Sequence, residues 1–205
     1  MGMMERNKSE DKLEIVFVRH GESVGNALKG EDAVYTGRWD CDLTEKGREQ
    51  AKELYGDALL AGAEVCYVSS LKRAINTAKL ITDAELLIDS RLQERSLGEF
   101  EQKRIVDVVK SPEYAKYFTD PKYMEFRSSF SVNAPGGENY ADVCKRVRPF
   151  LDEVLKSDHH KILIVAHFVV IKCLIKELQG LSEEETLHLK VPNCEPIQLI
   201  VDRKR

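Results

Sequence analysis

Apolar residues along this chain gather in short continuous runs, each followed by a longer mixed or polar segment. The runs cover residues 13–18, 65–68, 86–88, 162–166 and 197–201. The first run shows too little alternation for a half-exposed strand, which predicts a strand buried on both faces. Because all five runs have the length of strands, five strands are predicted.

Between these runs the apolar positions recur at helical spacing. Thr44 can cap one helix, and Ser182 opens a capping box before another. Pro149 lies inside a predicted helix and should kink or divide it. The predicted helices cover residues 44–59, 73–81, 139–155, 169–178 and a short segment after residue 182.

Strands that alternate with helices predict an α/β fold, a three-layer sandwich with a mostly parallel central sheet. Residues 91–138 form a long insertion, with short helical pieces broken by Pro112 and Pro121. This insertion should form a helical lid over one edge of the sheet. We therefore expect a single domain over residues 12–205, preceded by a polar, disordered leader at residues 1–11.

Composition and charge narrow the class of protein. The 205 residues are 42% hydrophobic and 32% charged, which suits one α/β domain with a sizeable core. The net charge of −4 gives no reason to expect a nucleic-acid partner. No apolar run reaches the roughly 20 residues that span a bilayer. The five cysteines are widely spread and form no CxxC pair, which indicates a reducing, cytoplasmic compartment.

Three of the predicted strands end in residues of related chemistry. The first ends in Arg19-His20, the second is followed by Arg73, and the fourth ends at His167. Because the carboxyl ends of parallel strands share one edge of a sheet, two guanidinium groups and two imidazoles should meet there. Arginine can bind two oxygens of a phosphate, and a neutral imidazole beside it can attack the phosphorus.

Phosphoryl transfer also needs a proton for the leaving oxygen. The carboxyl groups of Glu94, Glu99 and Glu101 lie in the irregular start of the insertion and can supply one. Taken singly, a histidine, an arginine or a loop carboxylate is more often structural or solvated than catalytic. Recurrence of the same chemistry at successive strand ends is what favours a phosphoryl-transfer site.

Around these residues the chain resembles the histidine phosphatase superfamily, branch 1, the phosphoglycerate mutase-like type. The first block alone is a weak signal, whereas six ordered blocks between about residues 13 and 200 are highly specific. The blocks are Arg19-His20-Gly21-Glu22-Ser23 with Asn26, Asp42-Leu43-Thr44-Glu45-Lys46-Gly47, Ser69-Ser70-Leu71-Lys72-Arg73-Ala74-Ile75-Asn76-Thr77-Ala78, Leu92-Gln93-Glu94-Arg95-Ser96-Leu97-Gly98-Glu99-Phe100-Glu101, Pro135-Gly136-Gly137-Glu138 and Val165-Ala166-His167.

The resemblance implies a catalytic role for five residues. His20 would be the nucleophile that forms a phosphohistidine, and Glu94 the proton donor that later activates water. Arg19, Arg73 and His167 would complete the phosphate pocket. His20 should attack as a neutral imidazole, so an acceptor must hold its other nitrogen. The resemblance implies no metal and no other cofactor, and the sequence contains no HxxxH motif.

Further positions are expected to face the substrate. Asn26 matches an additional phosphate contact, and Thr36-Gly37 is similar to a substrate-loop element of the mutases. Phe168 departs from the family, which commonly has glycine after the second catalytic histidine; its ring could crowd the pocket or stack on the substrate. Gln102 likewise stands where many members carry glycine.

These observations favour a metal-independent phosphatase that acts on a small phosphorylated metabolite, such as a sugar phosphate or a phosphoglycerate derivative. The basic residues Lys103, Arg104, Lys122 and Arg127 could bind a second anionic group on that metabolite, or could simply be solvated. The expected partner is therefore a small phosphate ester, with no nucleic acid and no membrane. The sequence leaves open whether the chain forms a homodimer.

Two alternatives remain. A phosphoglycerate mutase shares the first chemical step, and residues 35–40 resemble its substrate loop. A phosphatase is favoured over a mutase by residues 93–98, the shorter insertion and the Pro-Gly-Gly-Glu block. A non-catalytic phosphate-binding protein is disfavoured, because the nucleophile, the acid and the phosphate ligands are all present.

Overall fold

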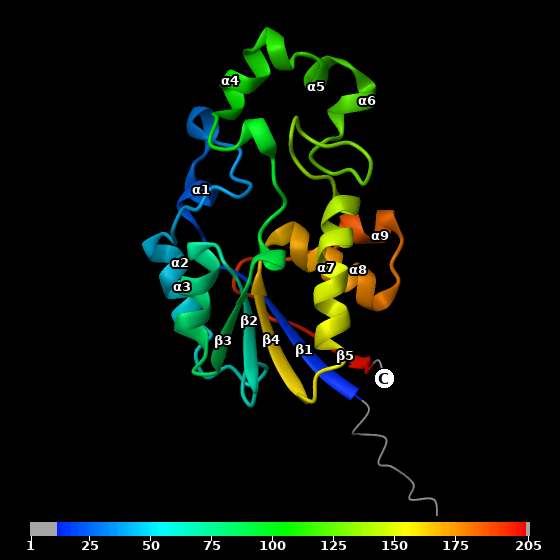
Figure 1. Ribbon diagram of the computed structural model, residues 1–205. Coiled ribbons are helices and arrows are strands. Elements are labelled where there is room, and N and C mark those ends of the chain that lie inside the picture. The colour runs from blue at the N-terminus through cyan, green and yellow to red at the C-terminus, as the bar shows by residue number, and fades with distance from the viewer. Residues whose placement is uncertain (1–11, 204–205) are drawn as a thin grey trace, which may run out of the picture.

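A five-stranded sheet forms the centre of the molecule in the computed structural model, which describes residues 12–203 (Figure 1). The strands are β1 Lys12–Arg19, β2 Val65–Ser69, β3 Glu85–Asp89, β4 Lys161–Ala166 and β5 Ile197–Asp202. Their order is β3-β2-β4-β1-β5, and only the edge strand β5 is antiparallel to its neighbour. The prediction of an α/β fold with a mostly parallel sheet is confirmed.

Capping residues set where several helices begin. Thr44 caps α2 (Glu45–Glu53), while Asn139 and Ser182 form capping boxes at α7 (Tyr140–Val154) and α9 (Glu183–His188). Helix α2 ends earlier than predicted, and Gly56 beyond it has a φ of +83°, a conformation that stops helices. The other α-helices are α1 Val24–Ala27, α3 Lys72–Ile81, α4 Ile105–Lys110, α5 Lys116–Thr119, α6 Pro121–Met124 and α8 Phe168–Gln179.

Helix α7 continues through Pro149, so of the two expected outcomes, a kink or a division of the helix, the division is wrong and the kink stays a prediction. A proline inside a helix removes one backbone hydrogen bond. Val147 before it and Phe150 after it are both buried, so packing against the core holds the two halves of the helix together.

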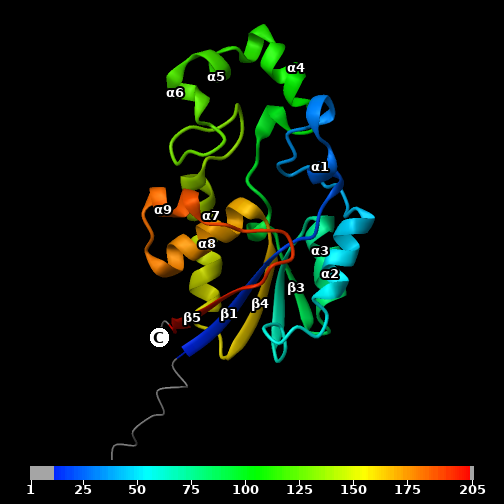
Figure 2. The same cartoon turned by 180° about the vertical axis from the view of Figure 1, so that it is seen from behind.

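Helices cover both faces of the sheet, which gives three layers (Figures 1 and 2). Leu13, Ile15 and Phe17 of β1 point into a buried cluster that α7 and α8 complete. Val16 and Val18 point into a second cluster, completed by α2 and α3. Successive side chains of a strand point to opposite faces, so a strand between two helical layers is apolar throughout.

Residues 91–138 form the lid, which lies above the carboxyl ends of the parallel strands (Figure 1). The lid has its own aromatic core, in which Phe100 packs against Tyr35 and Phe126. Tyr35 belongs to the loop between α1 and α2, and its backbone pairs with the lid through Gln102 and Lys103. The predicted substrate loop and the lid therefore form one unit.

Gln102 holds a backbone conformation that glycine adopts most easily. Its φ is +65°, in the left-handed region that a side chain disfavours. The Gln102 N–H donates to the Tyr35 carbonyl, a bond that ties the lid to the loop. The conformation is consistent with the resemblance, which leads one to expect glycine at this position.

Some expectations about the whole chain stay predictions. All five cysteines are buried and carry free thiols. Within residues 12–203, no helix is long and apolar enough to cross a membrane. The leader predicted for residues 1–11 lies outside the described residues. Cytoplasmic location and a homodimer remain untested.

Candidate active site

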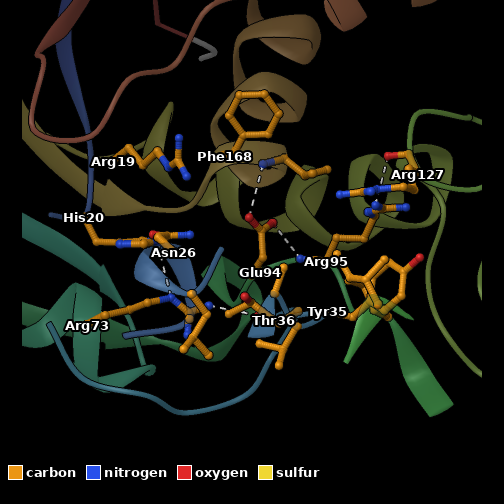
Figure 3. A pocket seen from close by; sticks show the side chains of 18 of the residues that line it. Arg19, His20, Asn26, Tyr35, Thr36, Arg73, Glu94, Arg95, Arg127 and Phe168 are labelled. Atoms are coloured by element: carbon orange, nitrogen blue, oxygen red, sulfur yellow. Dashed lines mark hydrogen bonds between the residues drawn. The ribbon is translucent and has the colours of Figure 1, made fainter. Parts of the chain in front are cut away.

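A cavity of about 510 Å³ opens between the carboxyl ends of the strands and the lid (Figure 3). It brings together almost all of the predicted site residues, which come from six separate segments of the chain. The predicted residues that line it are Arg19, His20, Asn26, Thr36, Gly37, Arg73, Glu94 and Phe168. Among the described residues, no cluster of three or more histidine, cysteine or acidic side chains could hold a metal ion.

His20 is buried, and its ring is fixed at both nitrogens. Nδ1 lies 2.7 Å from the Gly21 carbonyl oxygen, which can only accept, so Nδ1 carries the proton. Nε2 lies 3.2 Å from the Nε of Arg73, which can only donate, so Nε2 presents a lone pair. Burial lowers the pKa of His20 well below its ordinary value, and the charges of Arg73 and Arg19 lower it further. The imidazole is therefore neutral, as a nucleophile must be.

Arg73 also binds the backbone of the substrate loop, a role that the sequence did not indicate. Its guanidinium is almost fully buried and donates to the carbonyl oxygens of Trp39 and Gly37, at 2.6 Å and 2.9 Å. Gly37 has a φ of +44°, and a Cβ there would lie 2.6 Å from a carboxylate oxygen of Glu101. Arg73 thus holds the substrate loop in place and turns only its Nε toward His20.

His167 lies behind His20 rather than on the cavity wall, with 5.0 Å between the two ring centroids. Its Nε2 pairs with the Ser69 hydroxyl at 2.8 Å, whereas its Nδ1 is buried and has no hydrogen-bond partner among the described residues. Burial and then the charge of Arg73 lower the pKa of His167 well below its ordinary value.

Arg19 completes the cationic end of the cavity. Its Nη1 donates to the Val191 carbonyl at 3.0 Å, while its Nε is buried without a described partner. Burial lowers the pKa of the guanidinium, which nevertheless stays charged because arginine is so strongly basic. Buried donors are normally paired, so the unpartnered Nε of Arg19 indicates a place for an anion.

Glu94 is the carboxylate of the cavity, on the wall opposite His20 (Figure 3). Its two oxygens accept from the backbone N–H groups of Arg95, at 2.7 Å, and of Val169, at 3.4 Å. Val169 lies in the first turn of α8, so this helix fixes one oxygen of Glu94. Of the three acids expected from the sequence, this one alone lines the cavity.

The other two acids hold the lid. Glu99 accepts from the Tyr114 hydroxyl at 3.1 Å. Glu101 accepts from the backbone N–H groups of Arg38 and Leu97 and from the Ser96 hydroxyl. Neither of these carboxylates lines the cavity, which leaves Glu94 as the member of the acidic cluster that can supply the proton.

A loop between α9 and β5 supports Arg19 and His20 from behind, a contact that sequence reasoning missed. Asn193 donates its side-chain amide to the His20 carbonyl at 2.5 Å, and the Cys194 N–H donates to the Arg19 carbonyl. Val191 supplies the acceptor for the Arg19 side chain. This loop lies more than 170 residues from Arg19 in the chain, and no motif marks it.

A charged network that includes Glu138 supports Glu94. Arg38 donates to the Glu94 carbonyl at 3.0 Å and to both oxygens of Glu138. Glu138 also accepts from Arg146 and from the Ser96 N–H. The Pro-Gly-Gly-Glu block marked Glu138 in the sequence, but its partners could only be found in three dimensions.

The remaining predicted residues lie around the substrate end of the cavity. Asn26 uses its side-chain oxygen to cap α1, which leaves its amide N–H groups to face the cavity. Thr36 packs against Gly25, and the Phe168 ring lies 5.2 Å from the Arg19 guanidinium. Of the four additional basic residues, only Arg127 lines the cavity, where it lies over the Tyr35 ring.

Acid should destabilise this protein through its two buried histidines. In the unfolded chain a histidine takes up a proton near pH ~6.5, whereas His20 and His167 resist it when folded. Below that pH the unfolded state binds more protons, so the free energy of unfolding should fall by about 1.4 kcal/mol per pH unit for each histidine. Chemical denaturation between about pH 7 and 5 measures this slope.

A single variant identifies the source of the slope. His167→Asn should lower the difference in bound protons between the unfolded and folded states by about one, and so reduce the slope. An equal slope in the parent protein and in His167→Asn would contradict the assignment.

Comparisons with known proteins agree with this geometry. The family model described as the histidine phosphatase superfamily (branch 1) matches residues 15–205. The 2,3-bisphosphoglycerate-dependent phosphoglycerate mutase of Sinorhizobium fredii is 33% identical over 196 residues, which cover 89% of this chain and 87% of that protein.

Two solved structures share the fold. The alpha-ribazole phosphatase from Shigella flexneri has a TM-score of 0.77 and 24% identity, over 93% of this chain and 95% of its own. A mycobacterial glucosyl-3-phosphoglycerate phosphatase has a TM-score of 0.75 and 23% identity, over 92% of this chain and 90% of its own.

Proposed function

Because this chain belongs to the histidine phosphatase superfamily, branch 1, we propose that it hydrolyses a small phosphorylated metabolite through a phosphohistidine on His20. The observation that carries the proposal is the state of the His20 ring. Its Nδ1 proton is held by the Gly21 carbonyl, and its Nε2 accepts from the Arg73 Nε at the wall of a cavity that Arg19 also lines.

The first step transfers the phosphoryl group to the imidazole. The Nε2 lone pair of His20 forms a bond to phosphorus, and the bond from phosphorus to the ester oxygen breaks. The ester oxygen keeps that electron pair and takes a proton from Glu94. Arg19 and Asn26 donate to the equatorial oxygens, and Arg73 transfers its Nε–H bond from His20 to the phosphoryl group. His167 packs against the His20 ring from behind.

The second step returns the enzyme to its starting state. Glu94, now a carboxylate, removes a proton from water as the water oxygen bonds to phosphorus. The bond from phosphorus to Nε2 breaks, and its electron pair returns to the imidazole. The Gly21 carbonyl stabilises the positive ring of the intermediate through the Nδ1 proton. None of these steps uses a metal ion.

Access of water favours hydrolysis over return of the phosphoryl group to a bound product. Lys29, Gly30, Arg127 and Ser128 line the cavity and are exposed, so one end of it is open to solvent. A mutase must protect its phosphohistidine from water. The identity to a curated mutase and the Thr36-Gly37 loop keep a phosphoglycerate mutase as the second candidate.

A panel of phosphorylated metabolites separates the two candidates. We expect release of inorganic phosphate from at least one sugar phosphate or phosphoglycerate derivative, with EDTA present and without 2,3-bisphosphoglycerate. Interconversion of 3- and 2-phosphoglycerate that depends on 2,3-bisphosphoglycerate, with little free phosphate, would instead identify a mutase. Phosphate binding with no turnover of any ester would identify a binding protein.

Arg127 supports a substrate with a second anionic group. Its guanidinium lies over Tyr35, 5.5 Å from the ring centroid, and has no ionic partner among the described residues. Arg127→Gln should raise KM about tenfold for a substrate with a carboxylate or second phosphate, since a hydrogen bond to a charged group contributes about 1.5–3 kcal/mol. Steady-state kinetics on the best substrate from the panel measure the effect.

Lys122→Gln is the matched control, because Lys122 is an exposed cation of the lid that does not line the cavity. Neither variant should change KM for p-nitrophenyl phosphate, which has no second anion. An equal effect of Arg127→Gln on both substrates would argue against a second anion site.

A further inference from the structure

Two cations lie close to the Phe168 ring at the end of the cavity that holds His20. The Arg19 guanidinium carbon is 5.2 Å from the ring centroid, and the Lys172 ammonium nitrogen is 4.3 Å from it. Figure 3 shows Phe168 and Arg19 side by side above His20. An aromatic face attracts a nearby cation, most strongly where water is excluded.

Both cations are fixed to the same segment of backbone. Arg19 donates to the Val191 carbonyl, and Lys172 donates to the Leu187 carbonyl at 2.7 Å. Lys172 follows Phe168 by one helical turn on α8 and is buried, which lowers its pKa. The ring therefore packs among charged groups that are themselves held in place.

Arg19 needs such a support because it has few other contacts. A single hydrogen bond, from Nη1 to Val191, fixes its guanidinium, and its Nε has no partner among the described residues. One bond leaves the plane of the guanidinium free to rotate, whereas the attraction between the cation and the Phe168 ring adds a second contact that restricts this rotation. The restricted guanidinium can then present its remaining N–H groups to a phosphoryl oxygen.

We propose that Phe168 is a positioning residue that orients the Arg19 guanidinium for the phosphoryl group. The proposal rests on the proposed function and explains what this chain does with an aromatic ring where the resemblance leads one to expect glycine. The ring contacts Arg19, which binds the phosphoryl group, and its contribution to binding passes through Arg19.

Binding of inorganic phosphate, measured by isothermal titration calorimetry, tests the proposal without requiring turnover. Phe168→Leu keeps an apolar side chain of similar size but removes the ring face, so the Kd for phosphate should rise about tenfold. Phe168→Tyr keeps the ring and should stay within about twofold of the parent protein. In an Arg19→Lys background, Phe168→Leu should change the Kd less than about twofold, because the guanidinium is already gone.

Phe130 provides a matched control for loss of packing. It is also a partly buried phenylalanine on the same core, with the Lys176 ammonium 5.5 Å from its ring, but it does not line the cavity. Phe130→Leu should therefore leave the Kd for phosphate unchanged. Thermal denaturation of each variant confirms that it is folded.

Several results would overturn the proposal. These are an unchanged Kd in folded Phe168→Leu, an equal loss of affinity in Phe130→Leu, or a full effect of Phe168→Leu in the Arg19→Lys background. A parent protein that binds phosphate but hydrolyses no ester would contradict the proposed function alone. The order of phosphate affinities among the variants would still decide the role of Phe168.

Discussion

Replacing His20 with alanine should reduce the hydrolysis of any phosphate ester by at least about 10⁴-fold, because the variant lacks the nucleophile that divides the reaction into two steps. The parent protein, quenched during turnover, should carry phosphate on an acid-labile, base-stable bond, as a phosphohistidine does. The variant should carry none. Turnover of p-nitrophenyl phosphate and rapid-quench labelling with a radioactive phosphate ester measure the two effects.

The surface histidine His188 supplies the control. It is exposed and lies outside the cavity, so His188→Ala should keep both the full rate and the full amount of labelled enzyme. Binding of inorganic phosphate by His20→Ala would show that the cationic pocket is still formed. Retention of full turnover by this variant would exclude the proposed mechanism, whatever the stability of the protein.

The elements of the fold could be predicted because local sequence determines them. The apolar run that ends at Arg19 has no alternation, since residues on both of its faces enter buried clusters. Thr44, Asn139 and Ser182 begin helices through hydrogen bonds to residues three positions away, which are visible in the sequence. The expected division of α7 at Pro149 followed the local rule that proline interrupts a helix interior. Long-range packing holds this helix together instead.

The side chains of the site could be predicted from the topology of the sheet rather than from local sequence. Parallel strands bring their carboxyl ends to one edge, so Arg19, Arg73 and His167 converge once the order of strands and helices is known. The individual hydrogen bonds of these side chains could not be predicted from the order of strands and helices. The partners of Arg73 are two backbone carbonyls, which carry no sequence signal, and Asn193 reaches His20 from the far end of the chain.

The acidic loop shows how similar residues can differ in role. Residue type and position in the loop do not distinguish Glu94, Glu99 and Glu101. Only Glu94 lines the cavity and contacts the first turn of α8. The other two accept from groups of the lid. What separates them is the course of the backbone around Gly98, whose φ of +53° a short-range pattern does not predict.

Replacing Glu94 with glutamine should have an effect that depends on the leaving group. An alkyl phosphate needs a proton on its departing oxygen, so Glu94→Gln should slow its hydrolysis by about 10²–10⁴-fold. p-Nitrophenolate leaves without a proton, so the first step with p-nitrophenyl phosphate should be nearly unaffected. The second step still needs a base, and phosphohistidine should therefore accumulate. Stopped-flow absorbance should show a burst of one p-nitrophenolate per active site, followed by slow turnover.

Glu99→Gln is the matched control, because Glu99 lies five residues further along the same loop but bonds to Tyr114 and does not line the cavity. It should stay within about twofold of the parent on both substrates, since changes away from the reacting atoms rarely alter the chemical step. An equal loss of rate on alkyl and p-nitrophenyl phosphates in Glu94→Gln, without a burst, would show that Glu94 binds or orients the substrate and transfers no proton. A burst confined to p-nitrophenyl phosphate would assign to this carboxylate both the proton of the first step and the base of the second.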